Sequence, residues 1–119
     1  MNNRADGTLG EEAAVAYLDK RGYKIITRNF RVGRMGEIDI IGQDGDTLCF
    51  IEVKTRSSFD FGTPAQAVSS KKQATITRIA HIYMQNNRYS DVPVRFDIVE
   101  LIMARTGSIK DIALIQNAF

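Results

Sequence analysis

The sequence is short of the residues on which many metal and covalent sites depend. Its 119 residues contain no tryptophan, one cysteine (Cys49) and one histidine (His81). A lone cysteine cannot form an intramolecular disulfide, and we expect Cys49, inside an apolar run, to behave as a small buried hydrophobe. A single histidine excludes metal centres built from several histidines. Any chemistry is therefore expected to rest on carboxylates and lysine.

Long hydrophobic runs are also absent. No apolar stretch approaches the roughly 20 residues that cross a bilayer, and the polar segment at residues 1–6 lacks the apolar centre of a secretory signal. We therefore expect a cytoplasmic protein with no membrane contact. Hydrophobic residues make up 44% and charged residues 25% of the chain, as in ordinary globular proteins, and the length suits one domain over residues 1–119.

Acidic residues are missing from two long segments. Residues 20–36 contain six basic and no acidic side chains, and residues 61–90 contain four basic and no acidic ones. Such segments favour a polyanion as partner, nucleic acid above all, although a solvated surface without any partner explains them equally well. The candidate nucleic-acid contacts are Arg31, Arg34, Arg56, Lys71 and Lys72.

Helical spacing of apolar residues predicts two helices. The first is expected to start at a capping box formed by Thr8 and Glu11 and to stop before Gly22. Its spaced apolar positions are Leu9, Ala13, Ala16 and Tyr17. The second runs from Ser69 or Ser70 to Asn87. Its predicted buried stripe is Ile76, Ile79, Ala80 and Tyr83.

Alternating and β-branched runs predict five strands, at residues 23–30, 37–41, 48–55, 94–103 and 109–115. Asp44-Gly45 is a turn signal typical of an antiparallel hairpin between the second and third strands. The order α-β-β-β-α-β-β indicates an α/β fold, a mixed β-sheet flanked by helices. The second helix allows a parallel crossover between the third and fourth strands, whether or not those two strands pair directly.

A pair of opposite charges lies inside the most strand-like run of the sequence. Because side chains alternate along a strand, Glu52 and Lys54 share one face while Ile51 and Val53 share the other. The predicted hairpin brings Asp39 beside them. An even-numbered loop places Asp39 and Glu52 on the same face, whereas an odd-numbered loop without a bulge separates them.

Two carboxylates that lie close together call for a cation between them. At ~4 Å they repel by about 4 kcal/mol at an effective dielectric constant of 20. Mg²⁺ suits such a site, because it prefers hard oxygen ligands and usually takes one or two carboxylates, water and substrate phosphate. Lys54 could then position the attacking water and counter the charge that develops on the phosphate. The structural alternative is a buried ion-pair network without catalytic role.

Several motifs along the chain follow a known family pattern in order. They are Gly10-Glu11, Arg28-Asn29-Phe30, Gly36-Glu37-Ile38-Asp39, Phe50-Ile51-Glu52-Val53-Lys54-Thr55-Arg56, Lys71-Lys72 and Arg95-Phe96-Asp97. With these motifs the chain resembles the PD-(D/E)-x-K nuclease superfamily, although Ile38 stands where the pattern has proline. It is most similar to the bacterial YraN-like family of predicted endonucleases, and its layout is similar to that of the archaeal Holliday junction resolvases.

The resemblance implies a restriction-endonuclease-like fold and an Mg²⁺-dependent endonuclease, with Mn²⁺ able to replace Mg²⁺. The substrate would be DNA, branched or junction DNA included. Asp39, Glu52 and the Val53 carbonyl would hold the metal, Lys54 would position the water, and Glu11 would be an auxiliary acid from the first helix. The alternative is a nucleic-acid-binding module that keeps the nuclease fold and does not cleave. A symmetric homodimer would suit a two-fold DNA substrate.

Some residues have equally good structural explanations. Glu11 could simply stabilise the start of its helix. Glu37 is either a further ligand or a partner of Arg34 or Arg56. Gln66 is a weaker candidate for a polar group near the site. His81 is left out of the site, and Asp97 is expected to pair with a basic residue inside the protein.

Overall fold

The computed structural model describes residues 3–57 and 68–119, with side chains from Leu9 onward. These residues form two helices and five strands: α1 (Asn3–Lys20), β1 (Lys24–Val32), β2 (Gly36–Asp44), β3 (Thr47–Ser57), α2 (Ser70–Asn86), β4 (Val94–Met103) and β5 (Ile109–Ile115). This order and the single mixed sheet confirm the predicted α/β fold class. Neither helix in the described ranges is long and apolar enough to cross a membrane.

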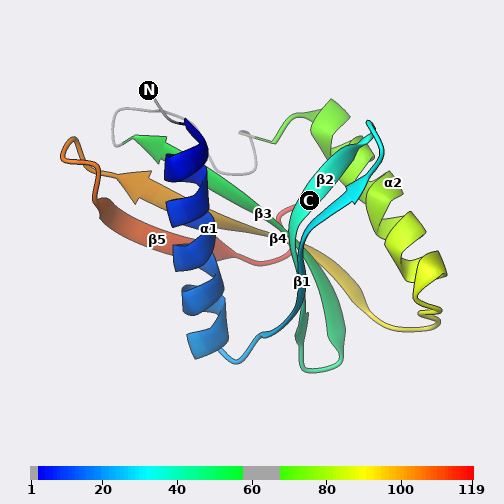
Figure 1. Ribbon diagram of the computed structural model, residues 1–119. Coiled ribbons are helices and arrows are strands. Elements are labelled where there is room, and N and C mark those ends of the chain that lie inside the picture. The colour runs from blue at the N-terminus through cyan, green and yellow to red at the C-terminus, as the bar shows by residue number, and fades with distance from the viewer. Residues whose placement is uncertain (1–2, 58–67) are drawn as a thin grey trace.

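The five strands follow one another in the sheet in the order of the sequence. The pairs β1–β2, β2–β3 and β4–β5 are antiparallel, whereas β3 and β4 pair directly and in parallel from Leu48↔Val94 to Ser57↔Met103. This settles the pairing that the sequence left open. Figure 1 shows α1 lying across one side of the twisted sheet, while α2, the connection between the two parallel strands, lies beside the β1–β2 hairpin.

Each helix covers its own hydrophobic core. Alternate residues of β3 point in turn to the two sides: Cys49 and Ile51 pack with α1, and Leu48 and Phe50 pack with α2. Cys49 is buried and free, as predicted. Each large side chain so buried stabilises the fold by about 1.5–3 kcal/mol. The even-numbered residues of β3, Glu52 among them, therefore belong to the side of the sheet that α2 covers.

Helix α1 differs from its prediction at its start and on its buried face. It begins at Asn3, so Thr8 lies inside the helix and the predicted cap is wrong. Ala14 and Leu18 are fully buried, whereas Leu9 is 48% exposed. The true face contains Gly10, where an added Cβ would lie 3.0 Å from Oγ1 of Thr55. This close approach needs glycine, which carries no apolar signal, and the periodicity was therefore misassigned by one residue.

Helix α2 and the β2–β3 turn agree with their predictions. The Ser69 hydroxyl accepts a hydrogen bond from the Lys72 N–H at 3.1 Å, which caps the helix start. The predicted stripe of four residues is the buried face of the helix. Between β2 and β3 the loop is the two residues Gly45-Asp46, and Gly45 has a φ of +61°, a value that glycine adopts without strain.

Candidate active site

The β2–β3 register brings Asp39 and Glu52 next to each other. The pairing runs from Asp44↔Thr47 to Ile40↔Ile51, and the next residues along the two strands are Asp39 and Glu52. Beyond that point the Val53 N–H donates a hydrogen bond to Oδ2 of Asp39 at 2.8 Å. The N–H and C=O of one residue in a strand face the same edge, so the Val53 carbonyl also faces β2. The two carboxylates and this peptide group therefore lie together.

The β1–β2 hairpin changes the face it presents at the level of Asp39. Ile38 and Ile40 are two residues apart and should share a face, yet Ile38 packs in the α2 core and Ile40 in the α1 core. On β1, Asn29 has a φ of +53°, an uncommon conformation that asparagine tolerates better than most residues. Regular alternation of side chains along a strand does not predict this change of face, which occurs at Asp39 itself.

Asp39 and Glu52 accept few hydrogen bonds, and the positive charges near Glu52 lie beyond hydrogen-bonding distance. The side chain of Glu52 is 6% exposed, its Oε1 has no hydrogen-bond partner, and its Oε2 lies 3.9 Å from Nζ of Lys54 and 3.7 Å from Nζ of Lys72. Burial, and then the negative charge of Glu52, raise the pKa of Asp39 to about 7, while the hydrogen bond from Val53 opposes the rise. A further cation at this place would relieve both acids.

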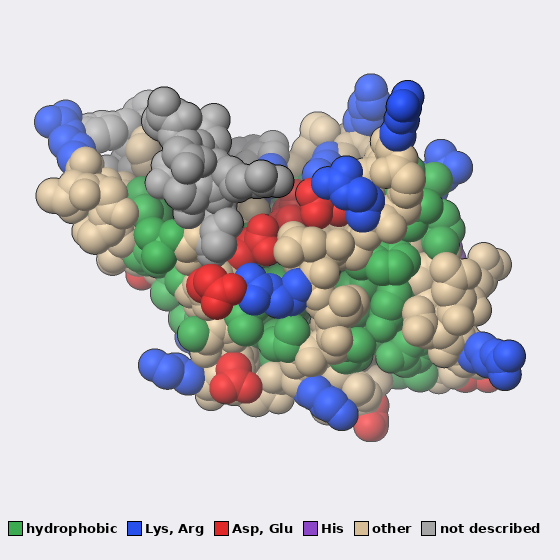
Figure 2. Space-filling view, viewed as in Figure 1, with side chains coloured by type: hydrophobic (Ala, Val, Ile, Leu, Met, Phe, Trp, Pro, Cys, Tyr) green, Lys and Arg blue, Asp and Glu red, His purple; other side chains and the backbone are tan. Residues whose placement is uncertain are grey.

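The available donor atoms suit a hard divalent cation. Two carboxylates and one main-chain carbonyl are oxygen ligands, and Mg²⁺ leaves the rest of its octahedron to water and phosphate. Among the side chains of residues 9–57 and 68–119, no group of three or more histidine, cysteine or acidic side chains could hold a metal. The Val53 carbonyl, which the family resemblance implies as a ligand, would add a main-chain oxygen to the two carboxylates. Figure 2 shows acidic and basic side chains next to one another in the middle of the viewed face.

Glu11 contacts Arg28 of β1. Oε1 of Glu11 lies 3.8 Å from Nη2 of this arginine, whose Nη1 lies 2.7 Å from Oε1 of Glu12. The ion pair ties the middle of α1 to β1. The contact directs Glu11 to Arg28, and the auxiliary role at the Asp39–Glu52 pair stays a prediction.

Two of the predicted nucleic-acid contacts are engaged by acids. Nη2 of Arg31 lies 3.1 Å from Oε1 of Glu37, so the expected partner of Glu37, Arg34 or Arg56, was wrong. Arg31 is the nearer residue because it stands opposite Glu37 in the β1–β2 pairing. Nε of Arg56 lies 2.8 Å from Oε2 of Glu100 on β4. Arg34 is exposed in the connection between β1 and β2.

The two lysines at the start of α2 have different surroundings. Lys71 is exposed, whereas Lys72 reaches Glu52. Sequence reasoning missed this contact because nothing local to residues 70–72 points to a strand residue. It also missed Glu100, which is buried on the α2 side of the sheet, although alternation with Ile98 could have indicated that face. Gln66 lies outside the described residues.

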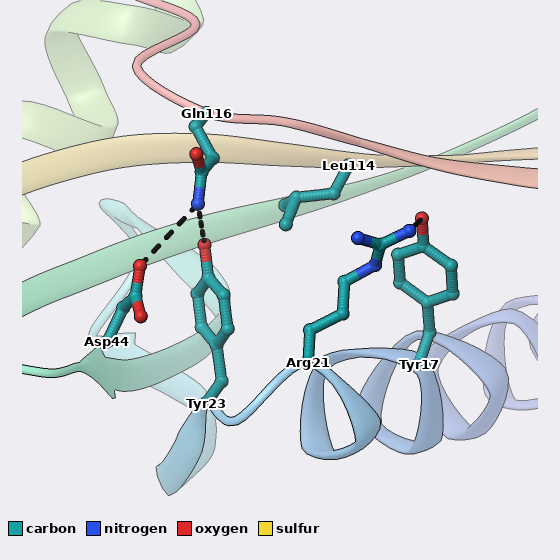
Figure 3. A pocket seen from close by; sticks show the side chains of 6 residues that line it. All are labelled: Tyr17, Arg21, Tyr23, Asp44, Leu114 and Gln116. Carbon is teal, nitrogen blue, oxygen red and sulfur yellow. Dashed lines mark hydrogen bonds between the residues drawn. The ribbon is translucent and has the colours of Figure 1, made fainter.

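A separate polar pocket of about 330 Å³ lies where α1 ends. Its lining residues are Tyr17, Arg21, Tyr23, Asp44, Leu114 and Gln116, none of them a predicted site residue. Figure 3 shows Gln116 pointing to the Tyr23 hydroxyl, to which its Nε2 donates at 3.0 Å, and Arg21 lying against Tyr17. The polar groups of the pocket bind one another, which indicates a structural role.

Comparison with known proteins places the chain in a family. Residues 10–101 match the model of UPF0102, described as an uncharacterised protein family. The chain belongs to the UPF0102 family. It is 50% identical to a UPF0102 protein of Acetivibrio thermocellus, over 99% of this chain and 93% of the relative. It is 46% identical to a UPF0102 protein of Dictyoglomus thermophilum, over the full length of both. This membership confirms the resemblance to the YraN-like proteins, and the relatives' names state no activity.

Proposed function

We propose that this UPF0102 protein is an Mg²⁺-dependent endonuclease that hydrolyses phosphodiester bonds of DNA. The observation that carries the proposal is the pair formed by partly buried Asp39 and buried Glu52. Oε1 of Glu52 has no hydrogen-bond partner, and the ammonium groups of Lys54 and Lys72 lie within 4 Å of Oε2 of the same residue. The pKa of Asp39 is raised to about 7. Such an arrangement costs stability when it is empty and suits a site that binds a cation and a phosphate.

Each residue has a definite part in this reaction. Asp39, Glu52 and the Val53 carbonyl would hold the divalent cation, which supplies positive charge against the phosphate and a lower pKa for a nearby water. Asp39 is oriented by the Val53 N–H, so its other oxygen remains for the cation. Lys54, on the same face as Glu52 and one-third exposed, can hold the attacking water and counter the charge of the phosphate.

The test is cleavage of labelled linear, flapped and four-way-junction DNA with Mg²⁺ or Mn²⁺. Asp39→Asn and Lys54→Ala should each lower the rate by about 100-fold or more, as loss of one stabilising group in the transition state does. Asp19→Asn, at an exposed position near the end of α1, makes the same charge change as Asp39→Asn and should leave cleavage unaltered. Equal cleavage by the wild type, Asp39→Asn and Lys54→Ala would mean that another enzyme was responsible.

A non-cleaving nucleic-acid-binding module is the second candidate function. It is favoured by the exposed basic side chains of Arg34 and Lys71, which can contact nucleic-acid phosphates. Salt-dependent DNA binding without turnover is then expected. Arg34→Glu and Lys71→Glu should weaken binding more than Asp39→Asn does. Unchanged binding in both charge-reversal variants would contradict this second function.

A further inference from the structure

Lys72 stands in a place that the acid–acid–lysine motif does not include. It lies in the first turn of α2, where its own N–H binds the capping hydroxyl of Ser69 at 3.1 Å. Its Nζ lies 3.7 Å from Oε2 of Glu52, against 3.9 Å for Nζ of Lys54. The cap therefore fixes the backbone of Lys72 at the start of α2, from where this second lysine reaches across to Glu52 on the sheet.

Both lysines approach the same oxygen of Glu52, and neither reaches hydrogen-bonding distance. Oε1 meanwhile has no partner. The contacts are thus electrostatic, and each can be given up at modest cost. The side chain of Lys72 is the more exposed of the two, at 41% against 33% for that of Lys54. A lysine carries its charge on a flexible four-carbon stem, which allows it to change partner without a backbone movement.

The geometry points to Lys72 as a positioning residue that exchanges partners during the reaction cycle. It neutralises Glu52 while the metal is absent, competes with a divalent cation for that carboxylate, and turns to the substrate phosphate once the cation is bound. The inference rests on the proposed function, because it takes Glu52 as a metal ligand. The bound cation would repel the ammonium group of Lys72, because both are positive and only a few ångströms apart. The ammonium group would then be free to contact the phosphate of the DNA, which the cation also attracts.

The first measurement is Mn²⁺ binding to the full chain without DNA, followed by electron paramagnetic resonance. Lys72→Gln should bind Mn²⁺ about tenfold more tightly than the wild type, because a competing charge is gone. Lys71→Gln makes the same change in net charge one residue away and should bind like the wild type. Lys72→Arg should restore the wild-type affinity. A purely structural role for Lys72 predicts equal or weaker Mn²⁺ binding in Lys72→Gln.

The second measurement is binding of a four-way junction DNA in Ca²⁺, chosen as a non-catalytic cation, and in EDTA. Lys72→Gln should weaken binding by about tenfold in Ca²⁺ and hardly at all in EDTA, whereas Lys71→Gln should have the same effect in both. Equal Mn²⁺ affinity in Lys72→Gln and the wild type, or an effect on DNA binding that does not depend on Ca²⁺, would overturn the inference alone. Absence of Mn²⁺ binding in the wild type would overturn the proposed function and the inference with it.

Discussion

Two buried acids on neighbouring strands have opposite surroundings. Asp97 of β4 is fully buried and accepts hydrogen bonds at 2.9 Å from the Tyr23 hydroxyl, from Nε of Arg95 and from the Asn117 N–H. Glu52 of β3 is nearly as buried, yet its Oε1 has no hydrogen-bond partner and its Oε2 lies 3.9 Å from Nζ of Lys54 and 3.7 Å from Nζ of Lys72. A satisfied buried acid holds a fold together, whereas an unsatisfied one is kept at a cost and indicates a site that binds something.

The network around Asp97 joins residues that are far apart in the chain, from Tyr23 to Asn117. Arg95 also binds Asp44 at 2.9 Å, and its hydrogen bond with Asp97 raises the pKa of the guanidinium group. Burial raises the pKa of Tyr23 to about 12, so its hydroxyl remains a donor at any physiological pH. The bond from Asn117 fastens the last residues to β4. The expectation that Asp97 pairs with a basic residue inside the protein is confirmed.

The largest effect on stability is expected from removing the charge of Asp97, the acid whose hydrogen bonds are satisfied. Asp97→Asn should lower the free energy of unfolding by about 4 kcal/mol, because it removes the fully buried charge on which Arg95, Tyr23 and Asn117 converge and leaves Arg95 only the partly exposed Asp44 as counter-charge. Urea unfolding at pH 7 measures this change. Asp111→Asn, at an exposed position on β5, is the matched control and should change stability by less than about 0.5 kcal/mol. If the two variants were equally stable, the Asp97 network would not hold the fold together.

The next effect concerns the unsatisfied acids and depends on pH. The pKa of Asp39 is about 7 in the folded state against an ordinary value of 3.8, so the folded protein holds this proton more strongly than the unfolded chain. The corresponding stability is fully present below about pH 4 and is lost as the pH rises through 7. The variant Asp39→Asn does not lose this stability as the pH rises, because asparagine does not ionise.

We therefore expect metal-free Asp39→Asn to be more stable than the wild type by about 2 kcal/mol at pH 8, roughly half of what the full pKa shift would give because Asp39 is partly exposed, with little difference at pH 4. Urea unfolding in EDTA across this pH range gives the comparison, and titrating groups remote from Asp39 cancel between the two proteins. A constant difference between them from pH 4 to pH 8 would show that Asp39 does not titrate near 7.

The smallest effect is expected at Glu52. Glu52→Gln removes the repulsion of Asp39 and lowers the pKa of that acid from about 7. It also deprives Lys54 and Lys72 of their partner, but both ammonium groups are partly exposed and remain solvated. The two changes oppose each other, so the free energy of unfolding should move by less than about 1 kcal/mol. A loss as large as that expected for Asp97→Asn would make Glu52 a structural acid like Asp97.

Local patterns were sufficient for much of the fold. Apolar spacing predicted the buried stripe of α2, and the Asp44-Gly45 pair predicted the β2–β3 hairpin. The strand β4 has the predicted bounds. The face of α1 was misassigned because its closest contact with the sheet is made by Gly10, which apolar spacing does not mark. The change of face between Ile38 and Ile40 also escaped, because regular alternation does not include it; Asn29, between the β1 partners of these two residues, has a positive φ.

By itself, the sequence determined which residue types could carry chemistry and that Asp39 and Glu52 stand on adjoining strands, because the Asp44-Gly45 pair marks a hairpin turn between them. The two-residue length of that turn, which sets the register, came from the structure. It also determined the family. Only the tertiary structure decided that Glu11 faces Arg28 and that Lys72 faces Glu52. These contacts join segments far apart in the chain, so they depend on how each helix lies on the sheet. The same packing decides that Asp97 has hydrogen-bond partners and that Oε1 of Glu52 has none.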